Sequence, residues 1–186
     1  GVVNTTVAIG CSLTPDYAFL APLTALMWRD AIGFKPLILL VGSGDEWHEG
    51  SANIVREALR RHEIEFRVIG RIEGYQDATV AQNVRHHVAS IIDDDGWIML
   101  SDADLWPIRR DFYHRHENFN GRAVCLYSNG DHFFGKKDVL AKFDAGSGFQ
   151  SIPTCHVTMR AKDWREIYNI IPGDVLGSTK QTLETM

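Results

Sequence analysis

An unbroken apolar run at Pro36–Gly42 (PLILLVG) constrains the fold more than any other feature of the sequence. A strand with no polar face fits the centre of a parallel sheet that is covered by helices on both sides. Strands are expected at 6–10, 36–42, 65–72, 97–100, 122–127 and 155–159, and helices at 14–32, 51–61, from 79 to about 92, and 163–170. This alternation predicts βαβ units, and hence an α/β fold with a mostly parallel central sheet.

Two of the expected helices carry start signals in the sequence. Thr14 is followed by Pro15, which suits an N-cap residue and the first helical position. Thr79 and Gln82 have the spacing of a capping box, in which the two side chains satisfy the first free amides of a helix. The helices at 14–32 and from 79 onward are therefore expected to begin at these residues.

Composition narrows the class of protein. The chain has 186 residues, of which 45% are hydrophobic and 23% charged, and its net charge is −5. These values exclude a disordered chain, allow one core, and give no bulk attraction to nucleic acid. No apolar run approaches the length of a membrane span and no signal-peptide pattern opens the sequence, so we expect a cytoplasmic protein without a transmembrane segment. Three cysteines without CxxC spacing indicate reduced, buried thiols.

A pair of acidic residues, Asp102 and Asp104, follows the apolar strand WIML. Ligands of parallel α/β sheets bind at the carboxyl ends of the strands, which is where this pair is expected. Two carboxylates one residue apart suit a hard divalent cation that also takes phosphate oxygens. A second pair, Asp93 and Asp95, lies in a DDDG turn, where solvated aspartates are ordinary. The sequence therefore predicts a metal site at Asp102 and Asp104.

The order of a helix with a basic residue (AQNVRHHVAS), an apolar strand (WIML) and the segment SDADLWP resembles the nucleotide-sugar glycosyltransferases of the GT-A fold. The resemblance covers the order of elements from Thr6 to about Ile171. Motif identity is limited to 101–104, with Arg85 as a second match. The resemblance implies one Rossmann-like catalytic domain over 1–186, of a compact bacterial or virus-encoded type. Its nucleotide-binding part would cover about 1–110 and its acceptor-side part about 111–186.

The resemblance also implies a function. Asp104 would bind Mn²⁺ or Mg²⁺, and Asp102 would bind the metal or the ribose of the donor. The donor would be a nucleoside-diphosphate sugar, with a UDP-sugar favoured, and the acceptor a glycan or a glycoprotein. A Lewis-acidic cation suits this reaction because it neutralises the departing diphosphate without proton transfer.

Several residues are candidates for nucleotide binding. Gly10, Cys11 and Ser12 follow the first strand, where small residues let the backbone approach a base and ribose; a tight turn without a ligand fits these residues equally well. Asp45 follows the second strand and can accept from uracil or ribose, although a solvated loop aspartate is the simpler interpretation. Arg85 suits a diphosphate because its guanidinium donates two parallel hydrogen bonds; the alternative is a surface arginine.

The histidines divide into two groups. His156 lies in the expected strand TCHVTM, and the resembled fold supplies a histidine as a further metal ligand in some members; a core histidine is the alternative. The pairs His86/His87 and His114/His116 lack the i, i+4 spacing of a helical zinc site. We expect these two pairs on the surface.

An inverting transferase needs a carboxylate that deprotonates the acceptor hydroxyl, whereas a retaining one need not have an obvious base. Asp131 (SNGDHF) and Asp174 (IPGDVLG) are the candidates, and a turn aspartate is the alternative for each.

Two other functions are compatible with the motif. A Mg²⁺-dependent phosphohydrolase of the haloacid-dehalogenase type also carries DxD at a strand end, but after the first strand of its core, whereas here the motif follows the fourth. Hydrolysis of the diphospho-sugar would distinguish this phosphohydrolase from a glycosyltransferase. A non-catalytic nucleotide- or glycan-binding module would bind without turnover.

Overall fold

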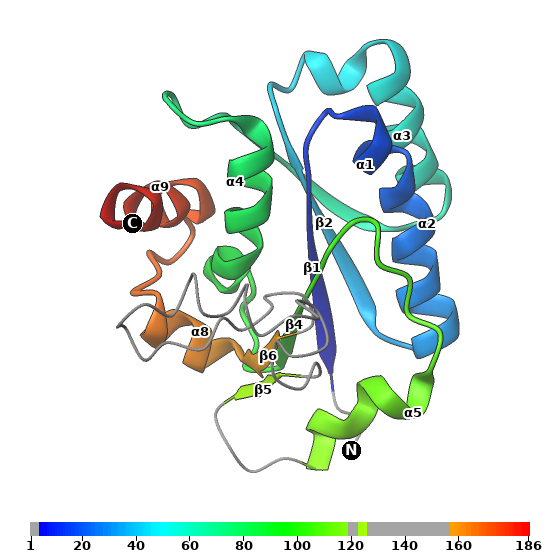
Figure 1. The fold of residues 1–186 in the computed structure, drawn as a ribbon, viewed down its shortest axis with the longest axis vertical. Helices are drawn as coiled ribbons and strands as arrows, with labels where there is room; N and C mark the ends of the chain where they lie inside the picture. The colour runs from blue at the N-terminus through cyan, green and yellow to red at the C-terminus, as the bar shows by residue number, and fades with distance from the viewer. Residues whose placement is uncertain (1–3, 119–122, 126–156) are drawn as a thin grey trace, which may run out of the picture.

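The computed structural model describes residues 4–118, 123–125 and 157–186. In this part of the chain, six strands form one sheet in the order β3-β2-β1-β4-β6-β5 (Figure 1). The strands are β1 (Thr5–Cys11), β2 (Lys35–Val41), β3 (Glu65–Ile69), β4 (Trp97–Ser101), β5 (Ala123–Cys125) and β6 (Val157–Arg160). The first four are parallel, whereas β6 is antiparallel to both β4 and β5. The predicted α/β fold with a mostly parallel sheet is confirmed.

Helices connect and flank these strands. The α-helices are α1 (Pro15–Ala18), α2 (Leu20–Leu26), α3 (Gly50–Arg61), α4 (Asp77–Val84), α5 (Arg110–Tyr113), α8 (Ala161–Ile167) and α9 (Val175–Thr185). A π-helical segment, η1 (Met27–Ile32), extends α2, and the 3-10 segments are η2 (Glu46–His48), η3 (Arg85–Ser90) and η4 (His114–Asn118). Gly33 ends η1 with φ 89°, a left-handed conformation that glycine adopts without strain.

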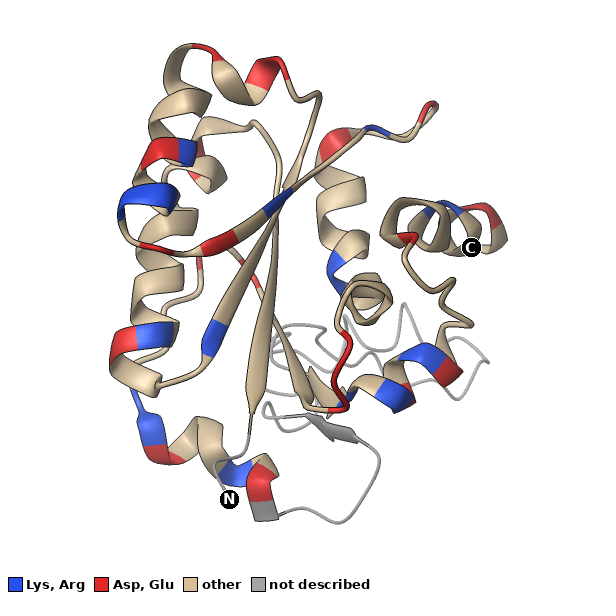
Figure 2. Ribbon diagram, turned by 180° about the vertical axis from the view of Figure 1, so that it is seen from behind, with Lys and Arg blue, Asp and Glu red and all other residues tan. Residues whose placement is uncertain are grey.

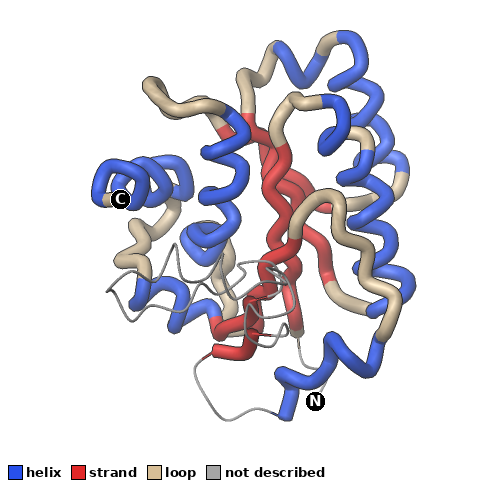
Figure 3. Tube along the Cα trace, viewed as in Figure 1, coloured by secondary structure: helices blue, strands red, loops and turns tan. Residues whose placement is uncertain are grey.

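The sheet separates two apolar cores, and helices cover both faces of it (Figure 3). β2 contributes to both: Ile38 and Leu40 belong to the core beneath α2 and α3, whereas Leu37 and Leu39 belong to the core beneath α4 and α9. Successive side chains of a strand point to opposite faces, so a strand buried on both faces needs apolar residues throughout. This explains the run that the sequence shows at Pro36–Gly42.

The helix starts differ from the prediction in one case. Pro15 does open α1, but α4 begins at Asp77, two residues before Thr79, and no side chain caps it. A reciprocal capping box forms instead in the loop after β2. The Ser43 amide donates to Glu46 Oε2 over 3.0 Å, and the Glu46 amide donates to Ser43 Oγ over 3.2 Å. Ser43–Glu46 has the S-x-x-E spacing that defines this motif.

Charged residues of both signs are spread over the outer helices and loops (Figure 2). β1, at the centre of the sheet, carries no charge along Thr5–Cys11. Among the described residues, no helix is both long enough and apolar enough to cross a membrane.

Candidate functional site

The ends of β1 and β4 lie side by side because the two strands are parallel neighbours. Their register pairs Ile9 with Ser101, so Gly10 and Asp102 occupy the carboxyl edge of the sheet together. A small pocket of about 100 Å³ opens at this edge. It is lined by Gly10, Ser12, Tyr17, Ala78, Ala81, Gln82, Asp102, Ala103 and Asp104. The pocket thus brings together residues from two candidate segments of the sequence, Gly10 and Ser12 after β1 and Asp102 and Asp104 after β4.

Arg85 reaches this site from the first position of η3. Its guanidinium donates to the carboxylate of Asp102, and its side chain is only 3% exposed, against 27% for Asp102. Arg85 also donates from Nε to the Gln82 carbonyl over 3.0 Å and from Nη2 to Gln82 Oε1 over 2.8 Å. The surface-arginine interpretation is therefore wrong. Arg85 is a buried cation that fixes Asp102 at the pocket.

The backbone of the acidic motif is anchored from the opposite face of the sheet. The indole of Trp28 donates to Ser101 Oγ over 3.0 Å, and Ser101 Oγ donates to the Asp102 carbonyl over 3.0 Å. Thr24 Oγ1 donates to the Ala103 carbonyl over 2.5 Å. Because Trp28 and Thr24 are fully buried, these bonds hold the motif to the buried side of α2 and η1.

The two carboxylates differ in their surroundings. Asp102 is half-buried and paired with Arg85, whereas Asp104 is exposed on the pocket wall. Both offer the oxygen ligands that Mg²⁺ and Mn²⁺ prefer, so the donor set fits a hard divalent cation. No group of three or more His, Cys, Asp or Glu residues suited to a metal occurs within the described ranges.

The turn after β1 is close-packed. A Cβ atom on Gly10 would lie 1.8 Å from the Ala81 carbonyl oxygen, so only glycine lets α4 approach β1 this closely. Cys11 is buried in the core beneath α2, and burial raises the pKa of its thiol to about 12. The neutral thiol donates to the Ser12 carbonyl, and Ser12 Oγ donates to Thr14 Oγ1 over 3.2 Å. Cys11 does not line the pocket, whereas Ser12 does.

Other predicted residues lie elsewhere. Asp45 is exposed, does not line the pocket, and its carbonyl accepts from the His48 amide over 2.9 Å. Asp174 is the N-cap of α9, where its Oδ1 accepts from the Gly177 amide over 2.7 Å. Its position gives it a structural role at the start of that helix. Asp131 and His156 lie outside the described residues.

The expectation of surface histidines is wrong for three of the four. His86, His87 and His116 are buried, and His114 is half-buried. His87 Nε2 lies 2.8 Å from Thr182 Oγ1, which joins η3 to α9, and His116 Nε2 lies 2.9 Å from Thr5 Oγ1, which joins η4 to β1. Burial lowers the pKa of His86 to about 4, so its imidazole is neutral at neutral pH.

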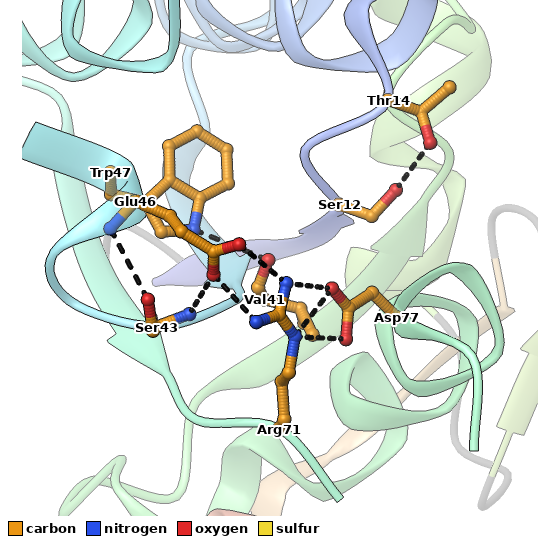
Figure 4. A network of polar contacts seen from close by, with 8 residues as sticks. All are labelled: Ser12, Thr14, Val41, Ser43, Glu46, Trp47, Arg71 and Asp77. Atoms are coloured by element: carbon orange, nitrogen blue, oxygen red, sulfur yellow. Dashed lines mark hydrogen bonds and ion pairs between the residues drawn. The ribbon is translucent and has the colours of Figure 1, made fainter. Parts of the chain in front are cut away.

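One polar cluster near the pocket, formed by Arg71, Glu46 and Asp77, was not predicted from the sequence. Arg71, in the segment after β3, bonds to Glu46 of η2 and to Asp77 at the start of α4 (Figure 4). The Arg71 and Ser43 contacts lower the pKa of Glu46 to about 2. The S-x-x-E spacing at Ser43–Glu46 was the available signal for the loop part of this cluster.

The chain has the GT-A type of fold, in which helices flank a mostly parallel sheet. Galactosyltransferase LgtC, in a complex with donor and acceptor sugar analogs, superposes with a TM-score of 0.56 at 13% identity. The match covers 97% of this chain and 66% of that one. An active-site mutant of LgtC matches with a TM-score of 0.56 at 16% identity, over 97% of this chain and 65% of that one.

A further neighbour is glucosyl-3-phosphoglycerate synthase from Mycobacterium tuberculosis in complex with UDP, with a TM-score of 0.49 at 12% identity, over 100% of this chain and 67% of that one. No protein-family model and no curated protein sequence matches the chain. At these identities the likeness to LgtC shows the fold alone. The chain spans just under two thirds of the length of LgtC.

Proposed function

We propose that the chain is the catalytic core of a metal-dependent, hexosyltransferase-like glycosyltransferase. It would move a sugar from a nucleoside-diphosphate sugar, preferably a UDP-sugar, to a glycan or glycoprotein acceptor. One observation carries the proposal: Asp102, fixed by the buried Arg85, and the exposed Asp104 share a pocket at the carboxyl edge of a GT-A sheet. The donor and acceptor analogs held by LgtC, which has this fold, support the choice of substrates.

Each residue of the site has a proposed role. Asp104 is exposed and would hold Mn²⁺ or Mg²⁺, while Asp102 would hold the same cation or the donor ribose. When bound, the cation supplies Lewis-acid neutralisation of the departing diphosphate. Arg85 is 3% exposed, so it acts first by orienting Asp102 and by placing positive charge behind it. Gly10 and Ser12 would form the wall that the nucleoside contacts.

The division of the chain into a nucleotide-binding part and an acceptor-side part is also a proposal. All residues that line the pocket fall between Gly10 and Asp104, which supports a nucleotide-binding part over about 1–110. The acceptor side is then proposed for about 111–186. Asp131 is proposed as the base of an inverting reaction, because Asp174 is engaged as a helix cap. Asp131→Asn should abolish transfer while retaining donor binding, and transfer at the parental rate would exclude this role.

A thermal-shift panel tests the function directly. The protein is heated with UDP-, GDP-, CDP- and dTDP-sugars, each with and without Mn²⁺. We expect a UDP-sugar to raise the melting temperature only when Mn²⁺ is present, since a ligand that binds only the native state stabilises it. The variant Asp104→Asn is the matched control and should lose this shift. Absence of a shift for every nucleotide would refute the proposal. Hydrolysis of the donor to a nucleoside monophosphate and a sugar phosphate, without sugar transfer, would favour a phosphohydrolase.

A further inference from the structure

Arg71 holds two carboxylates from two different elements at the same edge of the sheet (Figure 4). Its Nη1 and Nη2 lie 2.8 and 2.9 Å from the two oxygens of Glu46. Its Nε donates to both oxygens of Asp77, over 3.1 and 3.0 Å. We call Arg71, Glu46 and Asp77 the Arg71 cluster. A planar guanidinium suits this task because it can meet both carboxylates with paired donors.

Glu46 ties the cluster to the loop after β2. Its carboxylate also accepts from the Ser43 amide, which closes the capping box of that loop. The loop in turn supports the turn after β1, because a Cβ on Gly42 would meet Leu13 Cδ1 at 3.0 Å and Trp47 Nε1 at 2.9 Å. Leu13 directly follows Ser12, which lines the pocket.

Asp77 ties the cluster to the opposite wall of the pocket. It is the first residue of α4, and Ala78, Ala81 and Gln82 of this helix line the pocket. The pocket therefore has one wall after β1 and another on α4, and the Arg71 cluster joins the loop that supports the first wall to the start of the second. The third wall, which carries the acidic motif, is anchored separately by Arg85.

We infer that Arg71 is a positioning residue that sets the spacing of these two walls and so governs nucleotide affinity. The inference rests on the proposed function for the identity of the ligand. Arg71 does not line the pocket, and its side chain is 47% exposed, so its removal takes away no core packing. Its effect is transmitted through Glu46 and Asp77.

The test compares three variants of the whole chain. Arg71→Gln removes the charge, Arg71→Lys keeps it without the paired donors, and Arg67→Gln removes an exposed arginine of β3 that pairs with Glu65. Titration calorimetry with UDP and Mn²⁺ gives the affinity. Amide hydrogen exchange in segments 43–49 and 77–82, measured without ligand, reports whether Arg71 still holds the loop after β2 and the start of α4.

We expect Arg71→Gln to weaken UDP binding by about threefold to tenfold, since exposed ion pairs contribute little individually. Exchange should accelerate in segments 43–49 and 77–82 and stay unchanged in β1 and α9. Arg71→Lys should recover part of both effects, and Arg67→Gln should match the wild type. The inference is overturned if Arg71→Gln binds UDP as the wild type does, or if exchange accelerates equally throughout the chain.

If the proposed function is wrong, the same experiments give a different set of results. In that case the wild type binds no nucleotide, and exchange alone reports on Arg71. Faster exchange confined to the two segments would then still support its positioning of the walls, whereas unchanged exchange would overturn it.

Discussion

The guanidinium of Arg85 and the carboxylate of Asp102 form an ion pair whose two members differ sharply in burial, at 3% and 27% exposure. The cation depends on its surroundings for solvation, whereas water still reaches the anion. Removing one member of a buried pair is costly because the other is left in a poorly solvated position. The cost of breaking this pair should therefore depend on which member is removed.

The pairing of Asp102, but not Asp104, with the buried Arg85 predicts different effects for the two aspartates of the motif. Asp102→Asn removes the negative charge beside the buried Arg85 and should lower the free energy of unfolding by about 1–3 kcal/mol. Asp104→Asn changes an exposed side chain and should leave stability within about 0.5 kcal/mol. Both variants should lose metal-dependent nucleotide binding. Urea denaturation measures the first effect, and equal stability of the two variants would contradict the assigned role of Arg85.

Arg85 itself can be tested with ligands that differ in charge. Arg85→Ala removes the buried positive charge behind Asp102 and the contact that orients its carboxylate. Donor affinity should therefore fall by about tenfold to a hundredfold, or about 1.5–3 kcal/mol. UDP and UDP-sugar should be weakened more than uridine, which has no phosphates, and Arg85→Lys should restore only part of the affinity. Titration calorimetry of all three ligands gives the comparison. Equal weakening of uridine and UDP would indicate structural damage to the pocket instead.

The acidic pair in the turn before β4 offers a second comparison. Asp95 Oδ1 accepts from the Lys162 amide over 2.8 Å, a contact that an asparagine oxygen can also make. Replacing Asp93 and Asp95 together by Asn should therefore leave Mn²⁺-dependent nucleotide binding at the wild-type level. A loss comparable to that of Asp104→Asn would show that position at the strand end is not what distinguishes the two pairs.

The central sheet could be predicted because a strand that is buried on both faces has apolar residues at successive positions, and such a run is visible in the sequence. β2 alternates between two cores, so every position of 37–41 must be apolar. The acidic motif could be placed for a related reason, since it follows an apolar strand at once. Local periodicity and local chemistry were sufficient in both cases.

Contacts between segments that are far apart in the sequence produce no local pattern from which they could be predicted. Arg85 and Asp102 lie in different elements, and nothing in either segment shows that the arginine is buried against the carboxylate. The same holds for Arg71 and Glu46, which meet only when the connection after β3 and the loop after β2 come together. His87 and His116 were misplaced because the absence of metal-ligand spacing does not exclude the burial of a histidine that hydrogen-bonds to a threonine of another element.

Gly10 provides a test of how tightly the pocket is built. Its missing side chain admits the Ala81 carbonyl, which would lie 1.8 Å from an added Cβ. Gly10→Ala must move α4 away from β1 and should cost at least about 2 kcal/mol of unfolding free energy, the scale of an overpacked core. Gly44→Ala is the matched control, because nothing lies within 4 Å of a Cβ there. Urea midpoints that shift equally in both variants would contradict the close approach of α4.

The buried His86 predicts a dependence of stability on pH. Burial, with Arg85 as a secondary cause, lowers its pKa from the ordinary 6.5 to about 4. Between these values the unfolded chain binds a proton that the folded chain does not. Because protonation then favours the unfolded state, the free energy of unfolding should fall as the pH is lowered from 6.5 toward 4, by roughly 2–4 kcal/mol in total from this group.

The measurement is urea denaturation at several pH values between 4 and 7 for the wild type and His86→Asn. Burial also lowers the pKa values of His87 and His116, so the variant should keep part of the slope and lose the part due to His86. His62→Asn, at an exposed position beyond the end of α3, is the control for replacing a surface histidine by asparagine. A slope unchanged in His86→Asn would mean that this imidazole binds protons equally in the folded and unfolded chains, and the lowered pKa assigned to it would then be wrong.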